Sequence, residues 1–353
     1  MSNTALQPQA AQPTTSSDAE VQAALVSADD PQATPQERAE MLMEIARGLQ
    51  IRPRSAQPLR DAVTLCQRAQ SLLDPSNSDN DALLAARVQA LQGTALQALP
   101  AMPGDGEKSL QGAQDCYEQA RPVLARLGTP EETAELDMNL GLVVQSLVGA
   151  HRGRITDAIA HYHRALRVFT KQRWPREFSI VHNNLAIAYL AIPATDERAR
   201  MREALAVQSF EEVLQIITLV DHPAEYAMTQ NNLGNALQYA PSSHPMANLL
   251  RAIEAYDEAL KVRTPREMPV EYANTVSNKA NALLNLPDEG LSESMGAVGI
   301  SPNRAKARAL YREAQLIFDR HGLSDAAATV AEALAGIDGD GGDFAASRVP
   351  GSH

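Results

Sequence analysis

One stretch of this chain recurs along its length. Glu225–Leu237 is repeated at Glu271–Leu283 and, more loosely, at Glu177–Tyr189. A second kind of segment alternates with these copies and contains an aromatic residue and an Ala-Leu pair, as in Ala158–Leu166 and Ala252–Leu260. A pair of amphipathic helices repeated at a fixed period is the signature of a helical solenoid, in which each hairpin buries its apolar face against the next.

Small residues mark the repeats. They recur at intervals of 45 to 48 positions, where each is expected to let the two helices of a hairpin touch: Gly48, Gly93, Gly141, Ala186, Gly234 and Ala280. The second helices carry larger residues at the facing positions: Cys66, Tyr117, Tyr162, Phe210, Tyr256 and Tyr311. We therefore expect an all-α solenoid of about six helix hairpins, with a final capping helix over residues 324–337.

Four of the predicted first helices open with proline, at Pro130, Pro175, Pro223 and Pro269. Proline is favoured at the first helical position because its missing N–H is not needed there. A glutamate follows within two residues each time and suits the positive end of the helix dipole. These signals predict where the first helices begin.

The ends of the chain lack sustained apolar periodicity, apart from a short run at residues 19–26. Residues 1–34 are rich in Ala, Gln, Pro, Ser and Thr, which predicts a disordered tail, and residues 340–353 predict a second flexible tail. The repeats occupy residues 35–339 between them. The connection over residues 287–302, with its three glycines, is expected to be the most mobile loop.

Composition and charge exclude several functions. The net charge of −12 argues against a nucleic-acid partner, which needs a cationic surface. No apolar run is long enough to span a membrane, and no secretory signal is visible, so we expect a cytoplasmic protein. Cys66 and Cys116 fall at apolar positions and are expected to be buried free thiols. No catalytic constellation, phosphate loop or metal-ligand spacing is present, so we expect no enzymatic activity, no cofactor and no metal; the scattered histidines are expected to be exposed.

The repeats resemble tetratricopeptide repeats. Leu-Gly or Leu-Ala at residues 140–141, 185–186 and 233–234 matches the first helix of that family, and the Ala-x-x-x-aromatic-x-x-Ala-Leu pattern matches its second. The longer unit and the Asn-Asn-Leu core at residues 183–185 and 231–233 are similar to kinesin light chains and to bacterial arrays associated with CHAT proteases. The resemblance covers roughly residues 36–337 and implies a right-handed superhelix with a concave inner surface.

Asparagines gather on one side of the predicted first helices, although asparagine is a poor helix former. The candidate peptide-binding residues are Asn139, Asn183, Asn184, Asn231, Asn232, Asn235, Asn274, Asn278 and Asn281. By the family resemblance this side lines the concave surface. An amide both donates and accepts hydrogen bonds, so a row of them can hold the backbone of an extended peptide. The alternative is structural: the amides bridge neighbouring helices.

The corresponding inner positions of the first two units are less polar. They are Leu42, Ile45, Ala46 and Leu49, and then Arg87, Ala90, Leu91 and Thr94. A hydrophobic anchor pocket and simple self-packing both account for them.

The leading functional hypothesis is a non-enzymatic adaptor that binds a segment of a partner protein in the groove of repeats 3–6. A second hypothesis is a regulatory sensor whose superhelix responds to a small peptide or metabolite, because small rotations between repeats accumulate along an array. A weaker third hypothesis is an enzyme or an enzyme accessory subunit.

Overall fold

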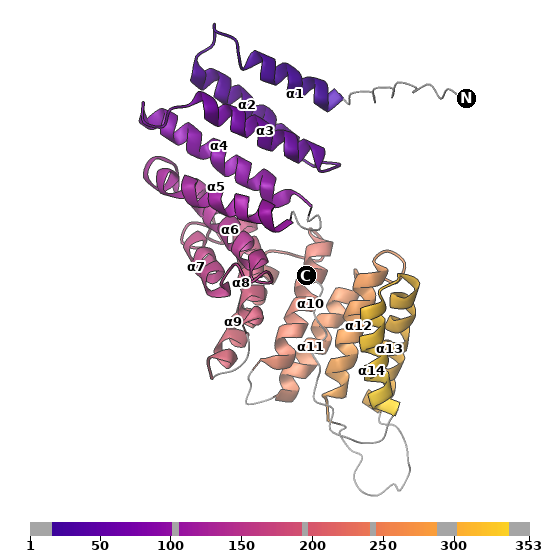
Figure 1. Ribbon diagram of the computed structural model, residues 1–353. Helices are drawn as coiled ribbons and strands as arrows, with labels where there is room; N and C mark the ends of the chain where they lie inside the picture. The colour runs from indigo at the N-terminus through magenta and orange to yellow at the C-terminus, as the bar shows by residue number, and fades with distance from the viewer. Residues whose placement is uncertain (1–15, 101–105, 193–196, 241–244, 288–301, 339–353) are drawn as a thin grey trace, which may run out of the picture. The chain divides into compact units, whose positions relative to one another are not determined.

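The protein is all-helical in the part that the structure describes (Figure 1). This computed structural model describes residues 16–100, 106–192, 197–240, 245–287 and 302–338. The helices are α1 (Ser16–Ser27), α2 (Pro35–Leu49), α3 (Gln57–Leu72), α4 (Asp79–Ala98), α5 (Gly106–Leu127), α6 (Pro130–Leu147), α7 (Ile155–Ala165), α8 (Pro175–Ala191), α9 (Glu197–Leu214), α10 (Pro223–Tyr239), α11 (Pro245–Leu260), α12 (Pro269–Leu284), α13 (Pro302–Arg320) and α14 (Ser324–Asp338). The expected tails over 1–15 and 340–353 and most of the loop at 287–302 lie outside the described residues.

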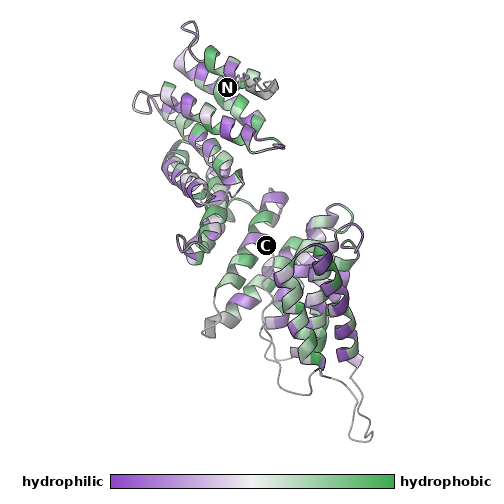
Figure 2. Cartoon of the chain, turned by 45° about the vertical axis from the view of Figure 1, so that its right-hand side comes forward, coloured by the Kyte–Doolittle hydropathy of each residue, from purple (hydrophilic) through white to green (hydrophobic). Residues whose placement is uncertain are grey.

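The helices pack as consecutive hairpins, α2 with α3 through to α12 with α13, and α14 covers α13. Within these residues the predicted all-α solenoid of six hairpins and a capping helix is confirmed. Apolar stripes alternate with polar ones around the helices (Figure 2). The chain divides into two compact units, residues 1–168 and 169–353, where the sequence predicts one domain over 35–339. Each unit is described by itself.

Helix α1 lies inside the segment predicted to be disordered. That prediction is wrong for residues 16–27, because Val21 and Ala24 are buried against α2 and α3. Ala28, just beyond the helix, is fully buried, and its carbonyl accepts a hydrogen bond from Arg38 at 3.0 Å. The short apolar run at residues 19–26 is ordered because it packs on α2 and α3, and the sequence does not specify that packing.

The helix starts follow from local chemistry. Helices α6, α8, α10 and α12 begin at the four predicted prolines. Thr34 and Thr129 each form a complete capping box, in which the threonine hydroxyl accepts from the backbone N–H of the third helical residue and the glutamate there accepts from the threonine N–H.

In three hairpins a glycine allows the close contact between the two helices. A Cβ added at Gly93 or Gly234 would lie 2.6 Å from the ring of Tyr117 or Tyr256, and Gly141 faces Tyr162 in the same way. The small-against-large pairing predicted from the sequence is therefore confirmed at these three hairpins. It is wrong at Gly48, where a Cβ would meet nothing within 4 Å. Ala46, two residues earlier, is fully buried there instead.

Candidate functional site

The predicted asparagines of the second unit lie on three first helices. Asn183 and Asn184 belong to α8, Asn231, Asn232 and Asn235 to α10, and Asn274, Asn278 and Asn281 to α12. Asn231 is buried and the other seven are half-buried. Their positions on successive first helices are those that the sequence pattern predicts.

Some of these amides bridge neighbouring first helices. The Asn278 amide donates to the Asn231 side-chain oxygen at 3.3 Å, and the Asn281 amide donates to the Gln238 side-chain oxygen at 3.1 Å. Both hydrogen bonds join α12 to α10. At Asn278, Asn281 and Asn231 the geometry therefore agrees with the structural alternative, in which the amides bridge neighbouring helices.

Asn235 links a first helix to its own second helix. Its side-chain oxygen accepts from the Tyr256 hydroxyl at 2.8 Å, and the Gln238 amide donates to the same hydroxyl. Burial raises the pKa of Tyr256 well above its ordinary value, so this phenol stays protonated and able to donate. Asn235 is thus engaged inside its hairpin.

The side chains of Asn183, Asn184 and Asn232 make fewer hydrogen bonds. Asn184 has no hydrogen-bond partner among the described residues, and Asn232 accepts one long bond of 3.5 Å from Asn231. The side-chain oxygen of Asn183 is buried without a partner in the same part of the chain. Asn184 and Asn232 occur at equivalent places in α8 and α10, two residues before the small residue of each repeat.

A cavity of about 590 Å³ opens on the first helices of the first unit. It is lined by residues of α2, α4, α5 and α6: Met43, Arg47, Arg87, Ala90, Leu91, Thr94, Tyr117, Leu124, Glu132, Glu135, Leu136 and Asn139. Asn139, the one predicted site residue of this unit, thus lies in a hollow rather than in a row of amides. The small Ala90 and Thr94 leave space where longer side chains would fill it.

The inner residues of the first two repeats divide between the cavity and the core. Arg87, Ala90, Leu91 and Thr94 of α4 line it, as a pocket requires. Leu42 and Ala46 of α2 are instead fully buried in the core, so self-packing holds for them. From α2 the cavity receives Met43 and Arg47, which the sequence argument did not select.

Polar groups of the cavity wall brace one another. Arg87 donates to Glu132 from Nε at 2.7 Å, joining α4 to α6. The Thr94 hydroxyl donates to the Gln50 side-chain oxygen at 2.7 Å, joining α4 to the residue that follows α2. Burial raises the pKa of Glu132, but hydrogen bonds from Arg87 and from the Thr129 N–H lower it to a net value below the ordinary one. Glu132 therefore both caps the start of α6 and pairs with Arg87 in the cavity wall.

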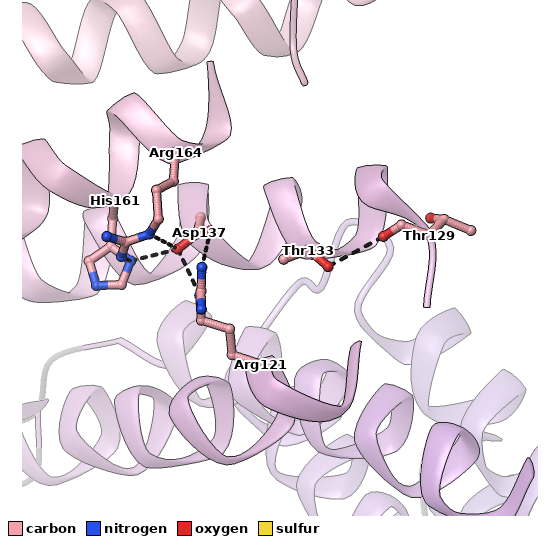
Figure 3. Close-up of polar contacts among 6 residues, drawn as sticks. All are labelled: Arg121, Thr129, Thr133, Asp137, His161 and Arg164. Carbon is pink, nitrogen blue, oxygen red and sulfur yellow. Dashed lines mark hydrogen bonds and ion pairs between the residues drawn. The ribbon is translucent and has the colours of Figure 1, made fainter. Parts of the chain in front are cut away.

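A second polar cluster was not foreseen from the sequence. Asp137 of α6 lies between Arg121 of α5 and two residues of α7, His161 and Arg164 (Figure 3). Arg121 donates to both carboxylate oxygens at 3.0 Å, Arg164 Nε donates at 2.9 Å, and His161 Nδ1 lies 2.9 Å from Oδ1. The side chain of Asp137 is only 3% exposed, and that of His161 is 15% exposed. The expectation of an exposed histidine is thus wrong at His161. Its ring packs against Asp137, which lies 24 positions earlier in the chain, and the sequence pattern did not indicate this contact.

Within the described ranges, no group of three or more His, Cys, Asp and Glu side chains is placed to hold a metal ion. The prediction of buried, free Cys66 and Cys116 is confirmed. Burial raises the pKa of Cys66 to about 12 and that of Cys116 to about 11, so neither is a ready thiolate nucleophile. None of the helices that the structure describes combines the length and the apolar character needed to cross a membrane.

No protein-family model matches the chain, and no curated protein sequence matches it. Solved structures of similar fold include the following three. BtubC (BKLC) from P. vanneervenii is 19% identical, with a TM-score of 0.47, over 71% of this chain and 92% of that one. The yeast Sti1 TPR2AB domain in complex with pHSP90 is 14% identical, with a TM-score of 0.27, over 86% and 99%. A Rap protein complexed with competence and sporulation factor is 14% identical, with a TM-score of 0.31, over 91% and 98%. These likenesses concern the fold alone.

Proposed function

We propose that this protein is a non-enzymatic adaptor that binds an extended segment of a partner protein on the first helices of its second unit. The observation that carries the proposal is the pair of half-buried amides at Asn184 and Asn232, which lack strong partners of their own. They repeat at the same place in successive first helices. An amide in this state can donate to a backbone carbonyl and accept from a backbone N–H without selecting a side chain.

Under this proposal the predicted peptide-binding asparagines have two different roles. Asn231, Asn278, Asn281 and Asn235 brace the helices through the hydrogen bonds described above. Asn184 and Asn232 face the partner, with Asn183 and Asn274 beside them on α8 and α12. Asn139 belongs to the cavity of the first unit. The bracing amides hold α10 and α12 at a constant spacing, which preorganises the surface for a ligand.

The test compares two double variants. Asn184→Ala with Asn232→Ala removes the partner-facing amides, and the loss of two net hydrogen bonds of about 1 kcal/mol each is expected to weaken binding roughly thirtyfold. The melting temperature is expected to hold, since alanine is the better helix former. Asn231→Ala with Asn278→Ala removes a bracing pair together, so its principal effect is expected on stability.

The partner for this measurement is the protein captured by the full chain from its native lysate and identified by mass spectrometry. Its affinity is then measured for the wild-type chain and both variants by titration calorimetry. An affinity that is unchanged in the Asn184 and Asn232 variant, with a lowered melting temperature, contradicts the proposal and assigns these amides to helix bracing as well.

The sensor hypothesis predicts a different observable. A ligand that changes the rotation between repeats changes the small-angle scattering profile of the chain, whereas an adaptor with a preorganised surface keeps its profile apart from the added mass. The cytoplasmic location stays a prediction from the sequence. The net charge of −12 continues to argue against nucleic acid as the partner.

A further inference from the structure

Helix α7 and the residues beside it form a cationic stretch in an acidic chain. Residues 151–168 contain four arginines and three histidines but one carboxylate, Asp157, whereas the whole chain has a net charge of −12. At the start of the helix, Arg152 lies 3.9 Å from Glu107 and Arg154 lies 4.0 Å from Asp157. All four side chains are more than half exposed, so these long ion pairs neutralise the arginines only weakly.

At the end of α7 positive charges outnumber negative ones. Arg121 of α5 and Arg164 of α7 share a single carboxylate, that of the buried Asp137 (Figure 3). Arg167 follows the helix directly, and its backbone N–H donates to the Arg164 carbonyl at 3.2 Å. Its side chain is exposed and forms no ion pair with any residue that the structure describes. We call Arg121, Arg164 and Arg167 the α7 patch; one carboxylate serves its three guanidinium groups.

Asp137 does not use all the donors of its two arginines. Arg121 donates to the carboxylate from Nε and Nη2, and Arg164 donates from Nε. Nη1 of each guanidinium has no hydrogen-bond partner among the described residues, and the two side chains are 33% and 30% exposed. A guanidinium has more N–H donors than one carboxylate can accept from. Both arginines can therefore bind a further carboxylate while they keep Asp137.

The dipole of α7 is a competing explanation for these charges. Cations are favoured in the last turn of a helix, and this accounts for Arg164 and Arg167. It does not account for Arg121, which α5 contributes. The buried carboxylate also holds two long side chains in place, so less rotamer freedom is lost when a ligand binds them.

We propose that the α7 patch docks a short acidic segment of a second partner protein, whose carboxylates pair with Arg121, Arg164 and Arg167. A carboxylate matches the planar guanidinium through parallel hydrogen bonds. At physiological ionic strength the field of the patch extends about 8 Å, which suits a short segment. Nucleic acid, a long polyanion, would extend over the rest of an acidic chain and be repelled there.

This inference goes beyond the proposed adaptor surface, because it gives the chain a second docking surface. The α7 patch lies on the second helices α5 and α7 and uses none of the first-helix amides. An acidic peptide is thus expected to bind the Asn184→Ala, Asn232→Ala variant with unchanged affinity, so the failure of one surface is distinguishable from the failure of the other.

The probe is a fluorescein-labelled peptide of alternating glutamate and glycine, titrated with the full chain at low ionic strength and followed by anisotropy. It is expected to bind and to lose affinity as potassium chloride is added, because salt screens exposed charges. The same peptide with glutamine in place of glutamate is expected not to bind.

Two variants test the patch residues. Arg167→Glu is expected to weaken the peptide about fivefold, since an attractive contact becomes repulsive. Arg121→Gln is expected to weaken it about threefold, and it leaves Arg164 and His161 on Asp137, so the cluster keeps two of its three partners. Circular dichroism and thermal melts show that each variant is folded before its affinity is measured.

The matched control is Arg60→Glu. Arg60 is an exposed arginine of α3, another second helix of the same unit, so the substitution changes the net charge by the same amount as Arg167→Glu. It is expected to leave the affinity for the acidic peptide unchanged.

Three outcomes overturn the proposal. Equal losses in Arg60→Glu and Arg167→Glu assign the binding to the overall charge of the chain. A single-stranded oligonucleotide of the same charge that binds more tightly than the peptide, and that Arg167→Glu weakens, assigns the patch to nucleic acid. Inorganic phosphate that displaces the peptide at a concentration equal to the peptide's own dissociation constant assigns the patch to a small free anion.

Discussion

Gly234 of α10 shows how single residues set the hairpin geometry. The ring of Tyr256 lies where a Cβ would stand, at 2.6 Å, and Tyr256 is fully buried. Gly234→Ala is expected to lower the free energy of unfolding by about 1–3 kcal/mol, because the ring has to shift within a packed core. Chemical denaturation followed by circular dichroism measures this change.

Gly48→Ala is the matched control, since Gly48 is exposed at the end of α2 with nothing near its Cβ position. This variant is expected to gain about 0.5–1 kcal/mol from helix propensity. Equal effects of the two substitutions would contradict the role assigned to the tyrosine ring.

Asp137 predicts a pH dependence of stability. Burial by itself raises the pKa of this carboxyl, but the hydrogen bonds from His161, Arg121 and Arg164 hold it well below its ordinary value of 3.8. A carboxyl with a lowered folded-state pKa stabilises the fold above its unfolded pKa, and this contribution is lost as the pH falls below about 3.8.

Asp137→Asn is expected to cost about 3–5 kcal/mol at neutral pH, since it leaves two arginines facing a neutral amide. As the pH falls below 4, the free energy of unfolding of the Asp137→Asn variant is expected to fall less steeply than that of the wild type. Urea titrations at several pH values measure both effects, and parallel pH profiles for the two proteins would contradict this account.

Arg263 departs from the pattern of the other second helices. Seven residues after the aromatic of the repeat the chain has Leu124, Phe169, Ile217 and Phe318, but Arg263 after Tyr256. Arg263 is 8% exposed, donates to the Thr275 hydroxyl at 2.9 Å, and keeps a buried Nε without a partner. Burial lowers its pKa below the ordinary value.

Arg263→Leu is expected to raise the free energy of unfolding by about 1 kcal/mol, because a hydrophobic residue replaces a buried cation at a position that is apolar elsewhere. The Thr275 hydroxyl keeps its bond to the Glu271 carbonyl. Arg263→Ala, which leaves a void, is expected to destabilise the fold. Thermal melts of the two variants should move in opposite directions.

At the scale of elements, α1 is expected to act as the cap of the first unit. Removal of residues 1–28 exposes the surface of α2 and α3 that Val21, Ala24 and Ala28 cover, and it removes the carbonyl that Arg38 bonds. The expected cost is about 2 kcal/mol of unfolding free energy. Removal of residues 1–15 is expected to cost nothing, because that sequence has no apolar periodicity. Thermal melts of the two truncations should therefore differ.

At the scale of the whole molecule, three hydrophobic clusters of described residues each lie within one unit. One cluster runs from Val21 to Ala95 and a second from Ala86 to Leu147, both within the first unit, while a third, from Ala273 to Ile337, lies in the second. Repeats are stabilised mainly by their nearest neighbours. A fragment of residues 1–168 is thus expected to fold alone, with helical circular dichroism and a cooperative melt. A fragment without cooperative unfolding would show that its stability depends on the second unit.

The sequence by itself determined the helix hairpins, their number and the residues at which many of them begin. These features depend on local chemistry: proline and threonine at helix starts, the apolar stripe of each helix, and a small residue that faces a large one 21 to 24 positions later in the chain. The same reasoning failed at Gly48 and over residues 16–27, where the outcome depends on what a segment packs against.

The tertiary structure alone decided the hydrogen-bond partners of the polar residues. Asn184 and Asn278 hold the same place in their repeats, but only Asn278 has a partner, Asn231, 47 positions away. Likewise, the cavity and the Asp137 cluster bring together residues from three or more helices. Whether a side chain braces two helices depends on the neighbour that folding brings to it, and the repeat pattern does not specify that neighbour.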